Sequence, residues 1–460
     1  MPNKTNRRNF VKTTAALGLG MWAAGGVSAK PSRSALEEIS FGCIGVGGKG
    51  SSDSADANDV SRHGSRVVAA CDVDDKALEK VKDKFVGAKH YNDYRKMLDE
   101  MGKSIDAVTV STPDHTHAVA ALQAMRMGKH CFCQKPMTHS IEEARMMAKV
   151  ATEKKIMTQM GNQHTADPIL RQSAALIKAG VIGKIKEAHI WTNRPVWPQS
   201  NNLKVEEPPV PSHVHWQEWI GPAKFRPYSN AIHPFKWRGF WDFGTGALGD
   251  MSCHTLNMAY MALNLRNPTS VEAKTAEHDR ICYPSASTIQ YEFPELDGRP
   301  ALTMYWYDGG KKPLELLKDC PKQKGARDRE SIYSSGALLI GEKGKFFSPG
   351  DYGGVSQHTG VVVDGEFTQQ LRLDMKAEYV RSPGHFKELT DAIRGGDKPM
   401  SNFEGYAGGL TETTLLGNLA VWSGKKIEWD AEKMVATNSD DETVKKLVRH
   451  DYQNGYTIHA

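Results

Sequence analysis

Residues 39–50 read Ile-Ser-Phe-Gly-Cys-Ile-Gly-Val-Gly-Gly-Lys-Gly, and this stretch decides the fold. Its apolar start is typical of a strand that is buried on both faces of a parallel sheet. Gly45, Gly47 and Gly50 follow in G-x-G-x-x-G register. In that register the glycines permit a tight turn, a close approach of the backbone to a pyrophosphate, and close packing of the next helix on the strand. The stretch therefore predicts a dinucleotide site at a helix N-terminus.

A second strand is predicted at 67–71, and it ends at Asp72, about 20 residues after Gly50. A carboxylate at this place accepts the hydroxyl groups of an adenosine ribose and repels a 2′-phosphate. Val73 and Asp74 follow it, where an NADP site would favour an arginine. The spacing therefore predicts NAD in preference to NADP; the alternative is that Asp72 only caps the next helix.

Apolar runs alternate with helical patterns through residues 38–160. This alternation predicts an α/β domain with a doubly wound parallel sheet, the Rossmann fold. The predicted helices are 76–85, 91–101, 118–127 and 141–154, and the further strands are 107–110 and 130–133. Ligands of such sheets lie beyond the carboxyl ends of the strands. We therefore expect Ser111, Thr112 and Pro113, and also Gln134-Lys135-Pro136, at the cofactor.

The pattern changes in residues 161–430, where strands follow one another. Such a succession predicts an α+β domain with an open, mostly antiparallel sheet, and residues 431–460 are left as a C-terminal tail. The predicted strands are 185–192, 270–275, 287–293, 301–306, 338–340 and 345–347. The predicted helices are 168–179, 248–263, 384–394 and 406–423. Residues 195–245 show no clear period and hold half of the ten tryptophans.

The N-terminus has the three parts of an export signal. Arg7-Arg8-Asn9-Phe10-Val11-Lys12 precedes a short apolar run at 15–24, and Val27-Ser28-Ala29 supplies small residues for cleavage. The paired arginines are similar to those of the bacterial twin-arginine signal. We expect residues 1–29 to be removed and the mature protein to be periplasmic; the alternative is a disordered basic leader.

Composition narrows the function. The formal net charge of the 460-residue chain is +5 and includes the basic leader, so we expect no nucleic-acid partner. No stretch reaches the length of a membrane span. The seven cysteines are spread out without C-x-x-C pairs, which argues against a disulfide framework.

Four features together resemble the glucose–fructose oxidoreductase/inositol dehydrogenase (Gfo/Idh/MocA) family. They are the glycine stretch with Asp72, the run Ser111-Thr112-Pro113-Asp114-His115-Thr116-His117, Gln134-Lys135-Pro136, and Gly249-Asp250-Met251-Ser252-Cys253-His254. The resemblance implies a Rossmann domain, a C-terminal domain for substrate and oligomerisation, and a homo-oligomer (dimer or tetramer). It also implies hydride transfer between a nicotinamide and a sugar or polyol, with His117 near the cofactor.

Lys135 and the pair Asp250–His254 are the candidate catalytic residues. Oxidation of a secondary alcohol needs a base for the hydroxyl proton, and partial burial lowers the pKa of a lysine such as Lys135. Asp250 and His254 are spaced i, i+4 and so share a helix face, where a carboxylate can orient an imidazole and favour its protonated form. Matched onto the family, His254 is the leading acid/base. Gln134 stands where the family has a glutamate, which leaves the charge around Lys135 open.

Other histidines, a glutamine and several tryptophans have weaker signals for a role in the site. His115 and His117 form H-x-H, but without a third ligand we expect no metal site. Gln163 and His164, at the crossover between the two domains, are expected to line the substrate site. One or two tryptophans are expected to face a sugar ring, because sugars stack on indoles; the candidates are Trp191, Trp197, Trp237 and Trp241.

Three functions compete. The first is an NAD-dependent oxidoreductase that acts on a secondary hydroxyl of a sugar, glycoside or polyol and keeps its NAD bound. The second is a glycoside hydrolase or lyase that oxidises a ring hydroxyl transiently, eliminates a leaving group and returns the hydride. The third is a sensor that binds NAD without turnover, against which the retention of Lys135, Asp250 and His254 argues.

Overall fold

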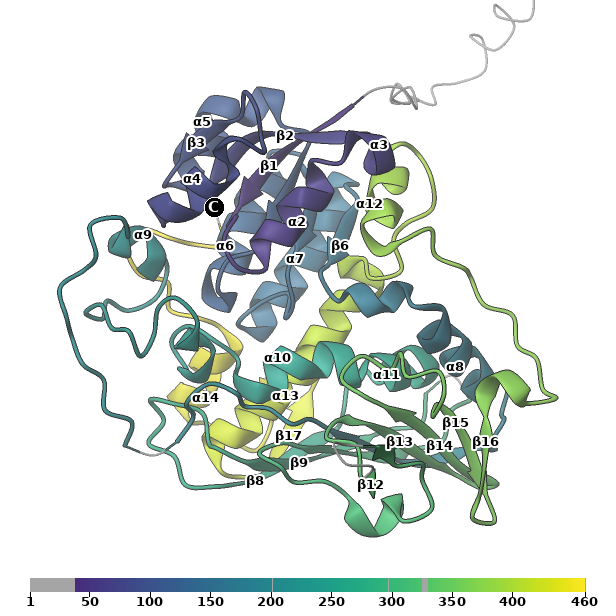
Figure 1. Ribbon diagram of the computed structural model, residues 1–460. Coiled ribbons are helices and arrows are strands. Elements are labelled where there is room, and N and C mark those ends of the chain that lie inside the picture. Colours follow the sequence, from purple (N-terminus) through teal and green to yellow (C-terminus); the bar gives the residue numbers. More distant parts are fainter. Residues whose placement is uncertain (1–37, 201, 297, 325–329, 460) are drawn as a thin grey trace, which may run out of the picture. The chain divides into compact units, whose positions relative to one another are not determined.

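The structure is a computed structural model that describes residues 38–200, 202–296, 298–324 and 330–459. Glu38–Ala460 form one compact unit. Two large sheets lie in it with helices between them (Figure 1), and a third sheet has only the two strands β11 (Gln323–Lys324) and β12 (Glu330–Ser331). The predicted leader at 1–29 lies outside the described residues.

The first sheet is the predicted parallel sheet. Its strands are in the order β3-β2-β1-β4-β5-β6, and every pair is parallel. The strands are β1 (Ile39–Ile44), β2 (Ser65–Cys71), β3 (Lys89–Tyr91), β4 (Ala107–Val110), β5 (His130–Cys133) and β6 (Thr158–Met160). The chain reverses its direction of winding between β1 and β4, which is where such sheets bind dinucleotides.

The helices of this half confirm the predicted alternation with two corrections. They are α2 (Gly50–Ala57), α3 (Val60–His63), α4 (Asp75–Lys82), α5 (Tyr94–Met101), α6 (Asp114–Arg126) and α7 (Ile141–Lys154). Tyr91, which was predicted to begin a helix, instead ends strand β3, and α5 begins at Tyr94 because Asp93 is its N-cap. Helix α6 begins at Asp114 instead of Ala118, since its polar first turn is buried against the second half of the chain.

The second sheet is mostly antiparallel, as predicted. Its order is β16-β15-β14-β13-β7-β10-β9-β8-β17-β18, in which β7 and β10 are parallel neighbours. The strands are β7 (Ile185–Trp191), β8 (Ser270–Thr275), β9 (Ser287–Phe293), β10 (Leu302–Tyr307), β13 (Gly336–Gly341), β14 (Gly344–Pro349), β15 (Gly360–Val363), β16 (Glu366–Gln369), β17 (Ile427–Asp430) and β18 (Val435–Ala436). Strands β15 to β18 were not predicted.

Helices α8 (Pro168–Lys178), α10 (Gly246–Thr255), α11 (Asn257–Leu263) and α13 (Gly408–Ser423) lie between the two sheets (Figure 1). The helix predicted at 248–263 is divided at Leu256 into α10 and α11. Helix α13 packs on β8, β9, α7 and α10 and so joins the two halves. Helix α13 lies close to β9 because Gly417 has no side chain: a Cβ there would be 2.0 Å from the Tyr291 hydroxyl.

The last residues pack onto the molecule. Helix α12 (His385–Ile393) contacts α3, and α14 (Glu442–Val448) contacts α13 and α7. In the segment predicted as a tail, Val444, Val448 and Ile458 are buried. Across the described ranges, the helices are too short or too polar to cross a bilayer.

Candidate active site

The glycine stretch forms the expected turn between β1 and α2. Gly45 has a φ of +82°, and a Cβ there would lie 2.6 Å from the Ser111 carbonyl oxygen. A Cβ at Gly50 would lie 2.1 Å from the carbonyl oxygen of Gly45, so both positions exclude a side chain. At Gly47 a Cβ would make ordinary contacts, 3.5 Å from Asp72 Oδ2. Glycine at this position keeps a longer side chain away from the carboxylate, which fits a dinucleotide.

Asp72 closes this turn with its carboxylate. Oδ2 accepts hydrogen bonds from the amides of Val46 (2.9 Å) and Gly47 (3.0 Å), and Oδ1 accepts one from Asp74 N (3.0 Å). Burial raises the pKa of Asp72, and these three amides oppose the rise. The helix cap is Asp74, whose side chain accepts from Lys76 N. Asp72 is therefore not the cap of α4 but a link between β2 and the glycine turn.

The residues predicted after β4 lie at its carboxyl end and are fixed by their neighbours. Thr112 Oγ1 donates to Pro113 O (3.3 Å), and Pro113 is the N-cap of α6. The buried His117 has one ring nitrogen 2.8 Å from Thr112 O and the other 2.9 Å from Pro136 O. The ring thus ties the loop after β4 to the loop after β5, and it engages both nitrogens with backbone.

A buried carboxylate that was not predicted lies between these loops. Asp53, on α2, is 2% exposed. Its Oδ2 accepts from Ser111 Oγ and from Gln134 Nε2, both at 2.8 Å, and its Oδ1 pairs with Lys49. The carboxylate that the resemblance leads us to expect at position 134 is thus supplied from α2, and Gln134 is its hydrogen-bond donor.

Lys135 and Asp250 are brought together across the two halves of the chain. Lys135 Nζ donates to Asp250 Oδ1 (2.7 Å) and to the Asp250 carbonyl oxygen (2.8 Å). Lys135 follows β5, whereas Asp250 lies in the middle of α10. The spacing within each motif predicted its local structure, but only the packing of α10 against the first sheet joins them.

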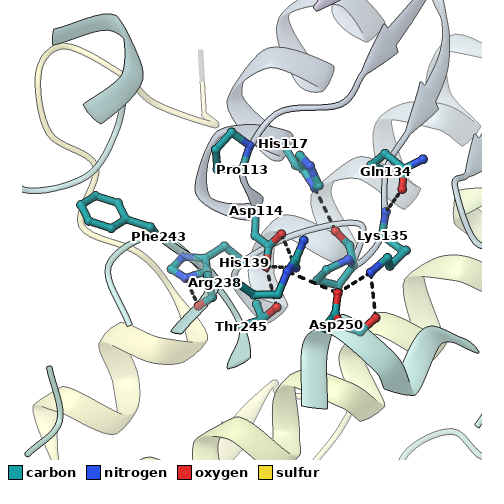
Figure 2. Close-up of polar contacts among 12 residues, drawn as sticks. Pro113, Asp114, His117, Gln134, Lys135, His139, Arg238, Phe243, Thr245 and Asp250 are labelled. Carbon is teal, nitrogen blue, oxygen red and sulfur yellow. Dashed lines mark hydrogen bonds and ion pairs between the residues drawn. The ribbon is translucent and has the colours of Figure 1, made fainter. Parts of the chain in front are cut away.

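Arg238 extends this pair into a chain of polar contacts, which Figure 2 shows. Its Nη1 donates to both oxygens of the buried Asp114 (2.8 and 2.9 Å), and its Nε lies 3.3 Å from Asp250 Oδ1. Thr245 Oγ1 also donates to Asp114 (2.6 Å). Burial alone would raise the pKa of Asp250, but the charges of Lys135 and Arg238 hold it well below its usual range. Arg238 lies in a segment without periodicity, so no sequence pattern identified it as a site residue.

His254 lies one turn after Asp250 on the same buried helix. Burial and the charge of Lys135 lower its pKa well below the usual value, more than Asp250 raises it. Asp250 thus favours the protonated imidazole, as expected, but burial and Lys135 outweigh it, and the pKa of His254 is lowered overall. Nδ1 of His254 is buried without a hydrogen-bond partner among the described residues.

Four further residues surround this centre. Arg194, after β7, has Nε 3.5 Å from Asp250 Oδ2 and Nη2 3.6 Å from Asp351 Oδ2. His164, predicted at the substrate, stacks on Tyr352 with ring centroids 4.2 Å apart. Tyr352 in turn meets the ring of His254 edge-on at 4.8 Å. Arg194, Asp351 and Tyr352 come from loops without a sequence motif, so sequence reasoning missed them.

The other expectations concern histidine and tryptophan. His115 is buried between the carbonyl oxygens of Phe243 and Trp219, and burial lowers its pKa to about 3. Within the described ranges, His, Cys, Asp and Glu side chains form no group of three or more that could hold a metal ion. Among the tryptophans, Trp191 and Trp241 are buried in the core, whereas Trp237 lies against the Arg238 guanidinium at 4.4 Å.

The glycine turn, Asp72 and the polar centre at the carboxyl ends of β4 and β5 define a dinucleotide-binding α/β protein with residues suited to acid–base chemistry. Two family profiles match the chain: oxidoreductase family, NAD-binding Rossmann fold, at residues 39–162, and oxidoreductase family, C-terminal alpha/beta domain, at residues 173–298. The chain belongs to the Gfo/Idh/MocA oxidoreductase family. The predicted NAD cofactor and fold class are confirmed.

Two curated relatives each match about a third of the chain. Levoglucosan dehydrogenase of Pseudarthrobacter phenanthrenivorans is 27% identical over 36% of this chain and 35% of its own length. Inositol 2-dehydrogenase of Salmonella paratyphi B is 30% identical over 33% of this chain and 45% of its own length. The matches thus span less than half of those relatives. The WlbA dehydrogenase of Bordetella pertussis, solved with NADH and UDP-GlcNAcA, has the same fold (TM-score 0.57, 17% identity, 86% of this chain and 99% of that chain).

Proposed function

We propose that this protein is an NAD-dependent oxidoreductase that acts on a secondary hydroxyl of a sugar, glycoside or polyol. The observation that carries the proposal is the meeting of Lys135 with Asp250, one helical turn from the neutral His254, beyond the carboxyl end of β5. The glycine turn and Asp72 would hold the pyrophosphate and the adenosine ribose. The related dehydrogenases for levoglucosan and inositol support a carbohydrate-like substrate.

Each reacting residue has a distinct role in this proposal. Bound NAD supplies the hydride acceptor for the alcohol carbon. The neutral imidazole of His254 takes the proton of the hydroxyl group. Lys135 Nζ donates a hydrogen bond to the same oxygen, and Asp250 orients the ammonium group through the 2.7 Å contact. Arg238 fixes Asp250 from the other side, which pre-organises the charges before substrate binds.

A substrate panel tests this function. The purified protein is incubated with NAD or NADP and with sugars, methyl glycosides and inositols, and the reduced-nicotinamide absorbance and the products are recorded. We expect a carbohydrate-dependent reduction with a preference for NAD. A protein that binds NAD but leaves every panel compound and the cofactor unchanged would support the sensor hypothesis instead.

The predicted leader extends the proposal. The twin-arginine route carries folded proteins, so NAD can be inserted before export, and outside the cytoplasm little free NAD is available for exchange. We therefore propose that the cofactor remains bound and is restored within each cycle, by the same substrate after elimination or by a second carbohydrate. Mass spectrometry of periplasm-derived protein would show NAD after dialysis. Product analysis separates cleavage from exchange between two sugars.

We also propose that copies of the chain associate as dimers or tetramers through the second sheet. Residues on one face of its central strands are only half buried, among them Tyr305, Tyr307 and Gln290. Light scattering of the mature protein should give a multiple of the monomer mass.

A further inference from the structure

Three buried polar atoms beside the reacting residues lack a hydrogen-bond partner in the described chain: Nδ1 of His254, Nδ1 of His164 and Oδ1 of Asp351. Tyr352 connects them, because it contacts both imidazoles and follows Asp351 directly. Buried polar groups are nearly always paired, so unpaired atoms gathered at one place indicate where a ligand binds.

The chemistry of Asp351 specifies one part of that ligand. Its Oδ2 faces Arg194 at 3.6 Å, and Arg194 also reaches Asp250 at 3.5 Å. The loop that carries Asp351 is thereby tied to the reacting centre through one guanidinium. The remaining oxygen, Oδ1, can only accept a hydrogen bond while the carboxylate is ionised. A ligand that meets it must therefore present a donor such as a hydroxyl group.

The charges of the centre are balanced before any substrate binds. Each cationic side chain lies within 3.6 Å of a carboxylate. Burial lowers the pKa of His254 and of His164, so both imidazoles are neutral at neutral pH. A carboxylate on the substrate would find no unpaired side-chain cation in this cluster and would face Asp351. The balanced groups are Lys135, Arg194 and Arg238 with Asp114, Asp250 and Asp351.

Tyr352 supplies an apolar surface at the same place. Its ring stacks on one imidazole and meets another edge-on, yet 37% of the residue is exposed. A sugar combines C–H surfaces with hydroxyl groups, and such a molecule suits an aromatic ring beside a carboxylate oxygen.

We propose that Asp351 and Tyr352 form the specificity subsite of this enzyme for a neutral polyhydroxy substrate. Asp351 Oδ1 accepts a hydrogen bond from a hydroxyl remote from the reacting carbon, and the Tyr352 ring packs against the C–H face of the substrate. This inference rests on the proposed function for the reacting end of the substrate, and it assigns the end that is not chemically changed.

Binding and turnover are measured separately on the full-length, NAD-loaded protein. The probes are D-glucose, methyl α-D-glucoside, myo-inositol and the acid D-glucuronate. The variants are Asp351→Asn, which keeps the size of the side chain, and Asp351→Ala. Asp374→Asn, an exposed aspartate in another loop, is the control. Calorimetry gives the affinity of each probe, and the reduced-nicotinamide band gives the rate.

We expect neutral probes to bind more tightly than glucuronate. Asp351→Ala should raise KM for the preferred neutral probe about tenfold or more and leave kcat within about twofold, because the interaction is made equally in the ground state and the transition state. A deoxy analogue that lacks the contacted hydroxyl should bind wild type and Asp351→Ala alike. Asp351→Asn should narrow the discrimination against glucuronate, and the control should change nothing.

The outcomes separate the subsite from the proposed function. Probe binding that depends on Asp351 without any change of the cofactor would support the subsite and contradict the oxidoreductase. Cofactor reduction with a KM indifferent to Asp351, or tighter binding of glucuronate than of glucose, would overturn the subsite alone. If no neutral probe binds, the subsite is also contradicted.

Discussion

Asp250 accepts contacts from three cationic side chains, and this explains the protonation of the residues around it. Lys135, Arg238 and Arg194 all lie within 3.5 Å of its carboxylate, so the group remains ionised although it is buried. Because Asp250 is engaged in this way, its charge does not raise the pKa of His254 enough to offset burial. The imidazole is left as the neutral acceptor of a proton.

Removing either reacting residue should therefore abolish most of the turnover. We expect Lys135→Met and His254→Ala each to lower kcat by about 10²-fold or more with NAD still bound, because one variant loses the hydrogen bond to the reacting oxygen and the other loses the acceptor of its proton, and such positioned groups contribute on that order. Steady-state rates on the substrate found in the panel and cofactor titrations check this. Lys154→Met, at an exposed position, is the control. Near-normal turnover in a variant would show that its residue is not part of the proton transfer.

Asp72 should determine both the affinity and the identity of the cofactor. In Asp72→Ala the acceptor for the ribose and the hydrogen bonds to Val46 N and Gly47 N are lost together. We expect NAD binding to weaken about tenfold or more and the preference over NADP to narrow. Calorimetric titration with both cofactors measures this. An unchanged ratio of the two affinities would contradict the assignment.

The hydrogen bond between Asp53 and Gln134 should survive if the carboxylate and the amide change places. It should not survive if both positions carry a carboxylate. Gln134→Glu alone would place a carboxylate against the buried Asp53 oxygen that now accepts from Gln134 at 2.8 Å. We expect a loss of about 2 kcal/mol in unfolding free energy and weaker NAD binding. The double variant Asp53→Asn/Gln134→Glu should recover most of the stability and most of the NAD affinity, because the amide at position 53 then donates to the carboxylate at position 134. A harmless Gln134→Glu would contradict this pairing.

At the scale of elements, the helices and strands that could be predicted are those with an apolar run or a periodic pattern of apolar residues and clear signals at their ends. Strands such as Ile39–Ile44 and Ala107–Val110 are apolar runs between glycine and polar turns, and helix Ile141–Lys154 begins with a capping box at Ser140 and Glu143. Local chemistry sets these boundaries. Strands β15 to β18 are short and have no such signal, since pairing with neighbours distant in sequence defines them.

The candidate site likewise has residues that the sequence predicted and residues that only the structure identified. Lys135, Asp250 and His254 lie in motifs that could be recognised in the sequence. Arg238 and Asp351 come from irregular segments, and they reach the site only because α6, α10 and the second sheet pack together. No local pattern encodes such contacts, so reasoning from sequence could not find them.

A pair of half-buried histidines links the C-terminal segment to the loop before α7. His450 Nε2 lies 2.7 Å from His139 Nδ1, and the rings are stacked. Burial lowers the pKa of each to about 4, although Glu143 and Asp114 near His139, and Asp242 and Asp451 near His450, act in the opposite direction. The segment therefore docks with both imidazoles neutral.

Acidification should weaken this docking. The unfolded chain has an ordinary histidine pKa of about 6.5 and binds more protons than the folded chain between pH 6.5 and 4. Stability should thus fall as the pH decreases through this window, by about 2 kcal/mol per such histidine between pH 7 and 5. Urea unfolding at pH 7 and pH 5 gives the difference in unfolding free energy between the two pH values. This difference should be smaller for His450→Asn than for wild type and should equal the wild-type value for the exposed His459→Asn. Equal pH dependence in His450→Asn would contradict the pair's role.

At the scale of the whole molecule, the site exists only because the two halves of the chain meet. The first sheet supplies the glycine turn and Lys135, α10 supplies Asp250 and His254, and loops beyond β7 and β14 supply Arg194 and Asp351. Helix α13 contacts α7 on one side and β8 and α10 on the other. The arrangement brings Lys135 from the first half and Asp250, Arg194 and Asp351 from the second half to one centre.

The central claim is that NAD bound by this chain takes a hydride from a carbohydrate at that centre. It is tested most directly by mixing the NAD-loaded protein, without free cofactor, with the substrate found in the panel and following the reduced-nicotinamide band over a single turnover. We expect the band to rise in wild type. In His254→Ala we expect its rate of rise to be lower by about 10²-fold or more. Product formation with no transient change of this band, or equal traces for the two proteins, would contradict the claim.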